Sequence, residues 1–341
     1  MLETIWFYIW GLLWAIYFML DGFDLGLATL RPFLARNDTE NRIIYNSMGP
    51  FWDGNEVWLI TAGGVTFAAF PTTYAVMFST LYTPLLMLLF GLIIRAVSFE
   101  FRGKGDSQAW RKLWDTCQFI GSFGPALLLG VAFANIFQGI PFDDKGVFHG
   151  TLLTLLNPYG LVGGALFVVM FAVHGAIWLA IKSEGDLHAR AASFAAKLWV
   201  ALLVIAVIFL IHTWFATPLY KNYLASPVLF LIPLATVAAL LVTRLFIGQA
   251  QWWKAWFASS ATIMGATMFG VAGLYPNLLP SSLNPAFSLT AFNSSSTHLT
   301  LTIMLVVALI FVPIVIAYQA WGYYIFREKL NEESLYSDEA Y

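Results

Sequence analysis

Two aspartates stand in an otherwise apolar stretch of this 341-residue chain, at about residues 5–29. Asp21 and Asp24 are three positions apart, so a helix places both carboxyls on one face. An ionised side chain in a membrane helix costs roughly 2.5–3.5 kcal/mol on insertion scales, so it needs a function or a partner. Gly22 and Gly26 form a Gly-x-x-x-Gly step that lets another helix approach closely. The pattern predicts either proton transfer within a membrane or structural acids satisfied by a neighbouring helix.

The next apolar stretch, at about 51–70, opens with a second pair of acids, Asp53 and Glu56. Their spacing is that of a helix capping box, and acids also suit the positive end of a helix dipole. One interpretation is therefore a well-made helix start. The other is a pair of proton carriers at the same shallow depth as Asp21 and Asp24, because carboxyls inside a membrane often form proton relays.

A further acid, Glu100, follows the third apolar stretch and lies between Arg95 and Arg102. Charged residues at the end of a membrane helix commonly anchor it at the interface. We interpret this group either as an interfacial ion cluster or, for Glu100, as a helper at a proton entrance.

Few side chains could bind a metal or haem. His174 lies inside a predicted span, but no second histidine shares its predicted depth, whereas haem needs axial ligands inside a packed bundle. His212 and His298 both fall near outer helix ends, so a shared ligand is conceivable there, and Cys117 is the single cysteine. We expect no metal site and no haem in this chain. No phosphate-binding loop, nucleophile elbow or zinc-protease motif is present in the sequence.

The composition determines which elements position these residues. Apolar residues make up 60% of the chain and charged residues 11%, against about 45–50% and about 25% in soluble domains. The net charge of −2 excludes a basic field for nucleic acid. We therefore expect an all-α polytopic integral membrane protein that forms a single membrane domain over residues 1–341. Nine stretches are long enough to cross a bilayer, at about 5–29, 51–70, 73–95, 115–137, 157–181, 197–215, 227–247, 255–275 and 299–325.

The lysines and arginines predict the orientation of these spans, because such residues collect in cytoplasmic loops. With nine spans and an outer (periplasmic) N-terminus, the inner loops hold 15 of the 17 basic residues and the outer loops hold only Lys145 and Lys221. Omitting the span at 51–70 would put the basic clusters at 31–42 and 95–112 on opposite sides. We therefore predict nine spans, a cytoplasmic C-terminus and a polar cytoplasmic tail at 330–341.

Distinctive motifs stand at Asp21–Gly26, Asn46–Leu59, Phe99–Arg102, Gly121–Phe123, Gly130–Asn135, Leu156–Leu161 and Tyr275–Thr300. Together they resemble those of one known family, subunit II of the cytochrome bd-type quinol oxidases. Glu56 and the Phe-Glu-Phe-Arg motif are similar to the cyanide-insensitive branch of that family. The Trp-Asp-Gly-Asn string, which contains Asp53, is the most specific of these motifs.

The resemblance implies a respiratory terminal oxidase that oxidises ubiquinol or menaquinol and reduces oxygen to water in the bacterial cytoplasmic (inner) membrane. It implies two four-helix bundles plus one peripheral helix, and a heterodimer with a subunit I that carries two b-type haems and haem d. A small single-helix subunit and a structural quinone also occur in the family. The resemblance places the proton path from the cytoplasm on Asp24 and Asp53, with Asp21, Glu56 and Glu100 as weaker candidates. From the residues alone, a proton-coupled secondary transporter and a purely structural scaffold stay open.

Overall fold

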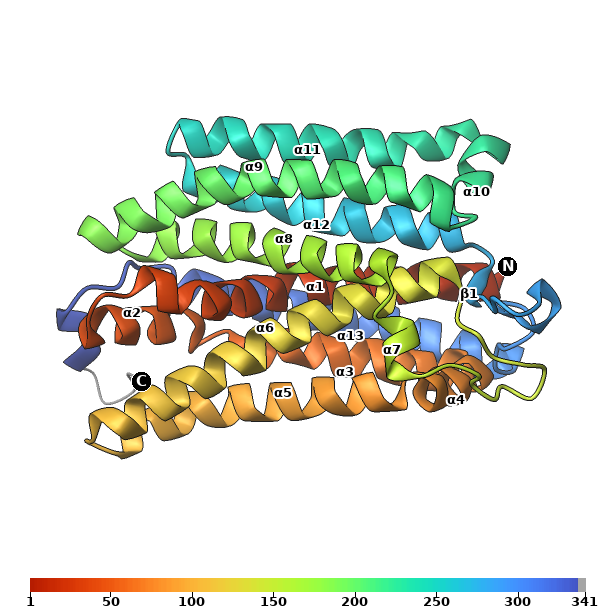
Figure 1. The fold of residues 1–341 in the computed structure, drawn as a ribbon, viewed down its shortest axis with the longest axis horizontal. Coiled ribbons are helices and arrows are strands. Elements are labelled where there is room, and N and C mark those ends of the chain that lie inside the picture. The colour runs from red at the N-terminus through yellow and green to blue at the C-terminus, as the bar shows by residue number, and fades with distance from the viewer. Residues whose placement is uncertain (337–341) are drawn as a thin grey trace.

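The structure, a computed structural model, describes residues 1–336, in which long helices run nearly parallel to one another (Figure 1). The last residues of the predicted tail, 337–341, lie outside the described residues. The long helices are α1 (Leu2–Leu34), α3 (Trp52–Ala69), α5 (Tyr82–Phe101), α6 (Gln108–Gln138), α8 (Pro158–Lys182), α9 (Gly185–Ala216), α11 (Leu231–Gly248), α12 (Trp252–Leu274) and α13 (His298–Ile325). The short helices are α2 (Asp38–Met48), α4 (Pro71–Thr80), α7 (Leu152–Leu155) and α10 (Tyr220–Ala225). The 3₁₀ turns are η1 (Arg102–Lys104), η2 (Pro227–Phe230), η3 (Pro285–Phe287) and η4 (Glu333–Tyr336), and the strands are β1 (Asn277–Leu279) and β2 (Leu289–Thr290).

Helix α1 lies at the centre of the bundle and packs against α3, α6, α8 and α12 (Figure 1). Glycines make its contact with α8 close. A Cβ added at Gly26 would lie 1.8 Å from the carbonyl oxygen of Phe171, and one added at Gly175 would lie 2.4 Å from the Leu27 nitrogen. The backbones of α1 and α8 can therefore touch only because these positions lack side chains.

The all-helical membrane architecture is confirmed. Within residues 1–336, eight helices are long and apolar enough to cross a membrane, all of the long helices except α3. Helix α3 has 18 residues and runs antiparallel to α1, since Asn55 contacts Asp24 near its start and Thr66 contacts Trp10 near its end.

The stretch expected as one span at 73–95 is divided into α4 and α5, with a break at Leu81. Pro84 stands in the first turn of α5, and it has no N–H to bond the carbonyl oxygen of Thr80. The division therefore follows from proline chemistry, and α4 lies at one end of the bundle (Figure 1).

Two long loops at the end that holds α4 are joined by hydrogen bonds. Strands β1 and β2 pair antiparallel, with Asn277 opposite Thr290. The Ile140 amide donates to the carbonyl oxygen of Pro280 at 2.9 Å, and the Ser281 hydroxyl donates to that of Phe142 at 2.6 Å. Residues 139–151 and 276–296 thus form one structured cap, which the sequence pattern did not indicate.

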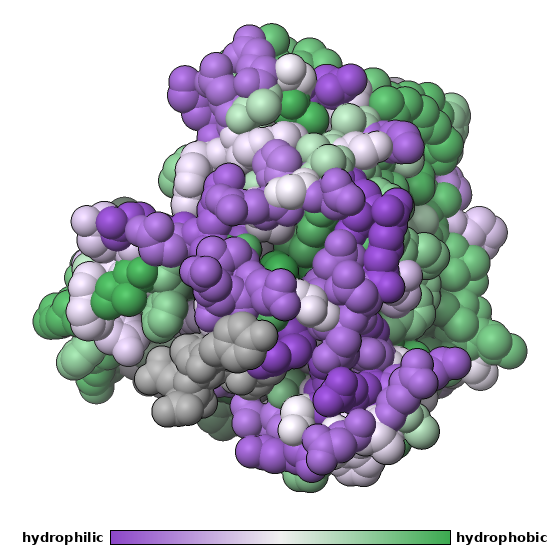
Figure 2. Space-filling view, turned by 90° about the vertical axis from the view of Figure 1, so that its left-hand side faces the viewer, coloured by the Kyte–Doolittle hydropathy of each residue, from purple (hydrophilic) through white to green (hydrophobic). Residues whose placement is uncertain are grey.

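The other end of the bundle, which we call the charged end, consists of α2, η1, the α8–α9 turn and residues 326–336. Figure 2 shows it as a largely hydrophilic face with apolar side chains at its borders. The chain after α13 folds back onto it. Leu330 donates its amide to the carbonyl oxygen of Lys182 at 2.7 Å, and Arg42 donates to that of Leu335 at 2.8 Å.

Candidate functional site

A buried ion pair joins α1 and α5. Arg95 Nη1 lies 3.0 Å from Asp21 Oδ2 and Nη2 lies 2.5 Å from Oδ1, and both side chains have no exposed surface. Glu56 of α3 lies 3.6 Å from the same guanidinium. Two parallel hydrogen bonds are the strongest way for a carboxylate to be held by arginine. Asp21 therefore has a structural partner, and Arg95 lies inside the bundle rather than at the interface.

Asp24, one helical turn further along α1, has a different environment. Its Oδ2 accepts a hydrogen bond from Asn55 Nδ2 at 2.7 Å, whereas its buried Oδ1 has no hydrogen-bond partner within residues 1–336. The side chain is 1% exposed. A carboxyl buried with a single neutral donor is poorly compensated as an anion, which distinguishes Asp24 from the arginine-paired Asp21.

Asn55 connects Asp24 to the last helix. Its Oδ1 accepts from Gln319 Nε2 and from the Tyr323 hydroxyl, both at 3.0 Å. Gln319 Oε1 in turn accepts from the indole nitrogen of Trp58 at 2.8 Å. Sequence reasoning did not single out these residues, although an asparagine and a glutamine inside apolar helices were a signal of buried hydrogen bonding.

Asp53 and Glu100 lie outside this cluster and are both exposed. Asp53 does not cap α3, because the helix begins at Trp52 and no side-chain capping bond is present at its start. Positions 53 and 55 are about 200° apart around a helix, so Asp53 faces away from Asp24 while Asn55 faces it. The structure therefore brings Asp21, Asp24 and Glu56 together and leaves the other two acids on the surface.

A second charged network holds the charged end together. Asp115 of α6 accepts from Arg102 Nε at 2.8 Å and lies 3.2 Å from Arg31 Nη1, and Arg102 also reaches Asp38 at 2.7 Å. The Tyr45 hydroxyl donates to Asp115 at 3.2 Å, and burial raises the pKa of this phenol, so it stays neutral. These contacts join α1, α2, η1 and α6, so much of the basic cluster has a structural role.

The buried histidine, His174, forms hydrogen bonds with other groups of the chain. His174 Nδ1 lies 2.6 Å from Ser259 Oγ, and its Nε2 lies 3.1 Å from the carbonyl oxygen of Met19. Both ring nitrogens are thus engaged, and the ring stacks on Trp256 at 5.4 Å. His174 does not suit an axial haem ligand, which needs a free nitrogen. Within residues 1–336 no group of three or more His, Cys, Asp or Glu side chains could hold a metal ion.

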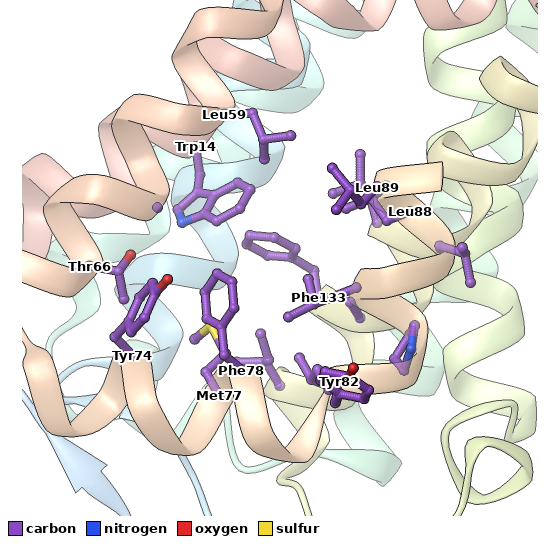
Figure 3. Close-up of a pocket in the computed structure, with 18 of the residues that line it drawn as sticks. Trp14, Leu59, Thr66, Tyr74, Met77, Phe78, Tyr82, Leu88, Leu89 and Phe133 are labelled. Atoms are coloured by element: carbon purple, nitrogen blue, oxygen red, sulfur yellow. The ribbon is translucent and has the colours of Figure 1, made fainter. Parts of the chain in front are cut away.

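An apolar cavity of about 610 Å³ lies between α1, α3, α4, α5 and α6. Figure 3 shows Trp14, Tyr74, Phe78 and Phe133 around it, with Leu88 and Leu89 opposite. Because its lining is almost wholly hydrocarbon and aromatic, the cavity suits an apolar chain.

Comparison with known proteins covers nearly the whole chain. A family model described as "Cytochrome bd terminal oxidase subunit II" matches residues 2–326. Cytochrome bd-I ubiquinol oxidase subunit 2 of Escherichia coli (strain K12) is 37% identical over 370 aligned positions, covering 98% of this chain and 96% of that protein. Cytochrome bd ubiquinol oxidase subunit 2 of Bacillus subtilis (strain 168) is 34% identical, covering 97% and 98%. A chain in the structure of bd oxidase from Geobacillus thermodenitrificans has the same fold, with a TM-score of 0.78 at 18% identity, covering 95% of this chain and 98% of that one. This chain therefore belongs to the family of cytochrome bd terminal oxidase subunit II.

Proposed function

We propose that this chain is the non-haem subunit of a quinol:oxygen oxidoreductase and supplies protons from the cytoplasm for the reduction of oxygen to water. The observation that carries the proposal is Asp24, a buried carboxyl with a single neutral donor and one oxygen without a partner in the described chain. Asp21 differs, because its two oxygens are held by Arg95, so we assign it a structural role. Glu56, whose buried Oε2 lies 3.6 Å from Arg95 and lacks a hydrogen bond within residues 1–336, is the second candidate carrier.

The chain is a multi-pass protein of the bacterial inner membrane, and we infer that its charged end faces the cytoplasm. The charged end and the helix ends that lead into it carry most of the lysines and arginines, whereas Lys145 in a loop and Lys221 in α10 lie at the other end. We also infer that α3 is the ninth span. It lies along α1, and its buried Asn55 donates to Asp24.

The redox centres belong, in this proposal, to a partner subunit I with two b-type haems and haem d. Both ring nitrogens of His174 are already hydrogen-bonded, which supports the proposal that this residue binds no haem. The cavity of about 610 Å³ would hold the apolar tail of a structural quinone. The exposed apolar side chains along α13, such as Ile310, Ile314 and Tyr318, suit burial against a partner or lipid.

The proposal is tested by Asp24→Asn in the whole complex. Asn keeps an oxygen that can accept from Asn55 but cannot exchange a proton, so the complex should assemble with all haems while quinol-driven oxygen consumption falls about tenfold. Asp24→Glu restores a titrating group slightly displaced and should recover part of the rate. Full turnover of Asp24→Asn would refute the proton role, and loss of the haems or of the partner would favour a scaffold.

The orientation is tested separately by reporters fused within the loops at 35–37 and 103–107. Both should give the same cytoplasmic signal, because α3 returns the chain across the membrane once between them and α4–α5 returns it again. Opposite signals would remove α3 from the count of spans.

A further inference from the structure

The hydrogen bonds that lead to Asp24 all run in one direction. An indole N–H can only donate, so Trp58 requires that the oxygen of the Gln319 amide faces it. The Gln319 amino group then faces Asn55 and donates to its Oδ1, and Tyr323 donates to the same oxygen. The Asn55 amino group is thereby turned toward Asp24.

The alternative orientation of Asn55 has a clear physical cost. If its amide were reversed, its amino group would meet the Gln319 amino group, and two donors would face each other in a buried site. Gln319 cannot reverse to relieve this contact, because its own amino group would then meet the Trp58 N–H. Asn55 is fully buried, so water does not supply a replacement acceptor.

Building on the proposed proton role of Asp24, we propose that Asn55, held in one orientation by Trp58, Gln319 and Tyr323, is a positioning residue that keeps the exchangeable proton of Asp24 on Oδ1. Oδ2 accepts the Asn55 donor, and in a neutral carboxyl the carbonyl oxygen is the better acceptor, so the hydroxyl is Oδ1. Oδ1 is the atom that has no partner within residues 1–336. The proton therefore enters and leaves Asp24 through Oδ1, the oxygen that Asn55 does not bond.

The experiment is infrared difference spectroscopy of the assembled complex, combined with oxygen consumption. The carboxyl band that Asp24→Asn removes belongs to Asp24. In Asn55→Leu this band should move to higher wavenumber, since the carbonyl loses its donor, and turnover should fall about tenfold because the reacting group is no longer oriented. In Trp58→Phe the band should split, since both amide orientations become accessible, and turnover should fall about threefold.

Trp199→Phe is the matched control. It removes another buried indole donor, which bonds the carbonyl oxygen of Leu240 at 2.8 Å between α9 and α11, and it should change neither the band nor the rate. If Asn55→Leu does not assemble, Trp58→Phe decides the question, because it keeps an aromatic ring in place.

Three outcomes separate this inference from the function on which it rests. An Asp24 band that is unmoved in both Asn55→Leu and Trp58→Phe overturns the positioning role. Slow turnover of Asp24→Asn without the loss of any carboxyl band overturns the Oδ1 assignment and leaves the proton role of Asp24 standing. Full turnover of Asp24→Asn overturns the proposed function itself.

Discussion

Arg95 and Asp21 form an ion pair in which neither side chain is exposed, with Nη1 3.0 Å from Oδ2 and Nη2 2.5 Å from Oδ1. Removing one member of such a pair leaves an uncompensated buried charge and costs about 3–5 kcal/mol. Asp21→Asn should therefore lower the midpoint of thermal unfolding and the yield of assembled complex. The double change Asp21→Leu with Arg95→Met should cost less than the two single changes together.

The control is an exposed ion pair at the charged end. Lys329 and Glu184 lie 3.7 Å apart with side chains 52% and 58% exposed, so Glu184→Gln should change stability by less than about 1 kcal/mol. A stable Asp21→Asn complex with slow turnover would instead make Asp21 a proton carrier.

Asp53 should behave differently from Asp24. It is exposed, and no side-chain bond caps the start of α3, so Asp53→Asn should change the free energy of unfolding by no more than about 0.5 kcal/mol. Because its side chain faces away from Asn55, turnover should fall less than in Asp24→Asn. The comparison is oxygen consumption of the two variants at equal haem content. A larger loss of turnover in Asp53→Asn would instead place the proton entrance on the exposed side of α3, where Asp53 lies.

The long helices and the close helix contact at Gly26 of α1 could be predicted from the sequence, because apolar length and the Gly-x-x-x-Gly spacing are local properties. The break at Leu81 was not predicted, because the stretch is continuously apolar. Pro84 was a local signal for it. The partner of Asp21 was not predictable, since Arg95 stands next to other charges and resembles an interfacial residue. Which arginine is buried depends on how α5 packs against α1.

The same reason explains why Asn55 was missed in the candidate site. A buried acid is a recognisable functional signal because burying its charge costs much free energy. An amide such as Asn55 costs little at the start of a helix, so it gives no comparable signal. Its role arises only when α13, more than 260 residues later, brings Gln319 and Tyr323 beside it. Long-range contacts of this kind are a consequence of tertiary packing and leave no periodic signal.

The histidines should be dispensable for haem binding. His174→Ala, His212→Ala and His298→Ala, made singly, should leave the three-haem spectrum of the complex unchanged. His174→Ala should nevertheless lower stability by about 2–4 kcal/mol, because it opens a cavity and removes the hydrogen bonds of the ring to Ser259 and to the Met19 carbonyl oxygen. Loss of one haem band in an assembled complex would show that this chain contributes a ligand.

Lys182 should hold the C-terminal segment against the charged end. The side chain is 2% exposed, and its ammonium donates to the carbonyl oxygens of Phe326 and, at 2.5 Å, Glu328. Hydrogen bonds from a charged donor are worth about 1.5–3 kcal/mol each, so Lys182→Met, which keeps the stem and removes the donors, should release the segment. Trypsin should then cut after Arg327 and Lys329 at least about tenfold faster in the purified complex. Lys197→Met removes an exposed lysine of α9 and should leave this cleavage rate unchanged. Equal rates in the two variants would mean that the Leu330 and Leu335 backbone contacts are sufficient to hold the segment without the ammonium.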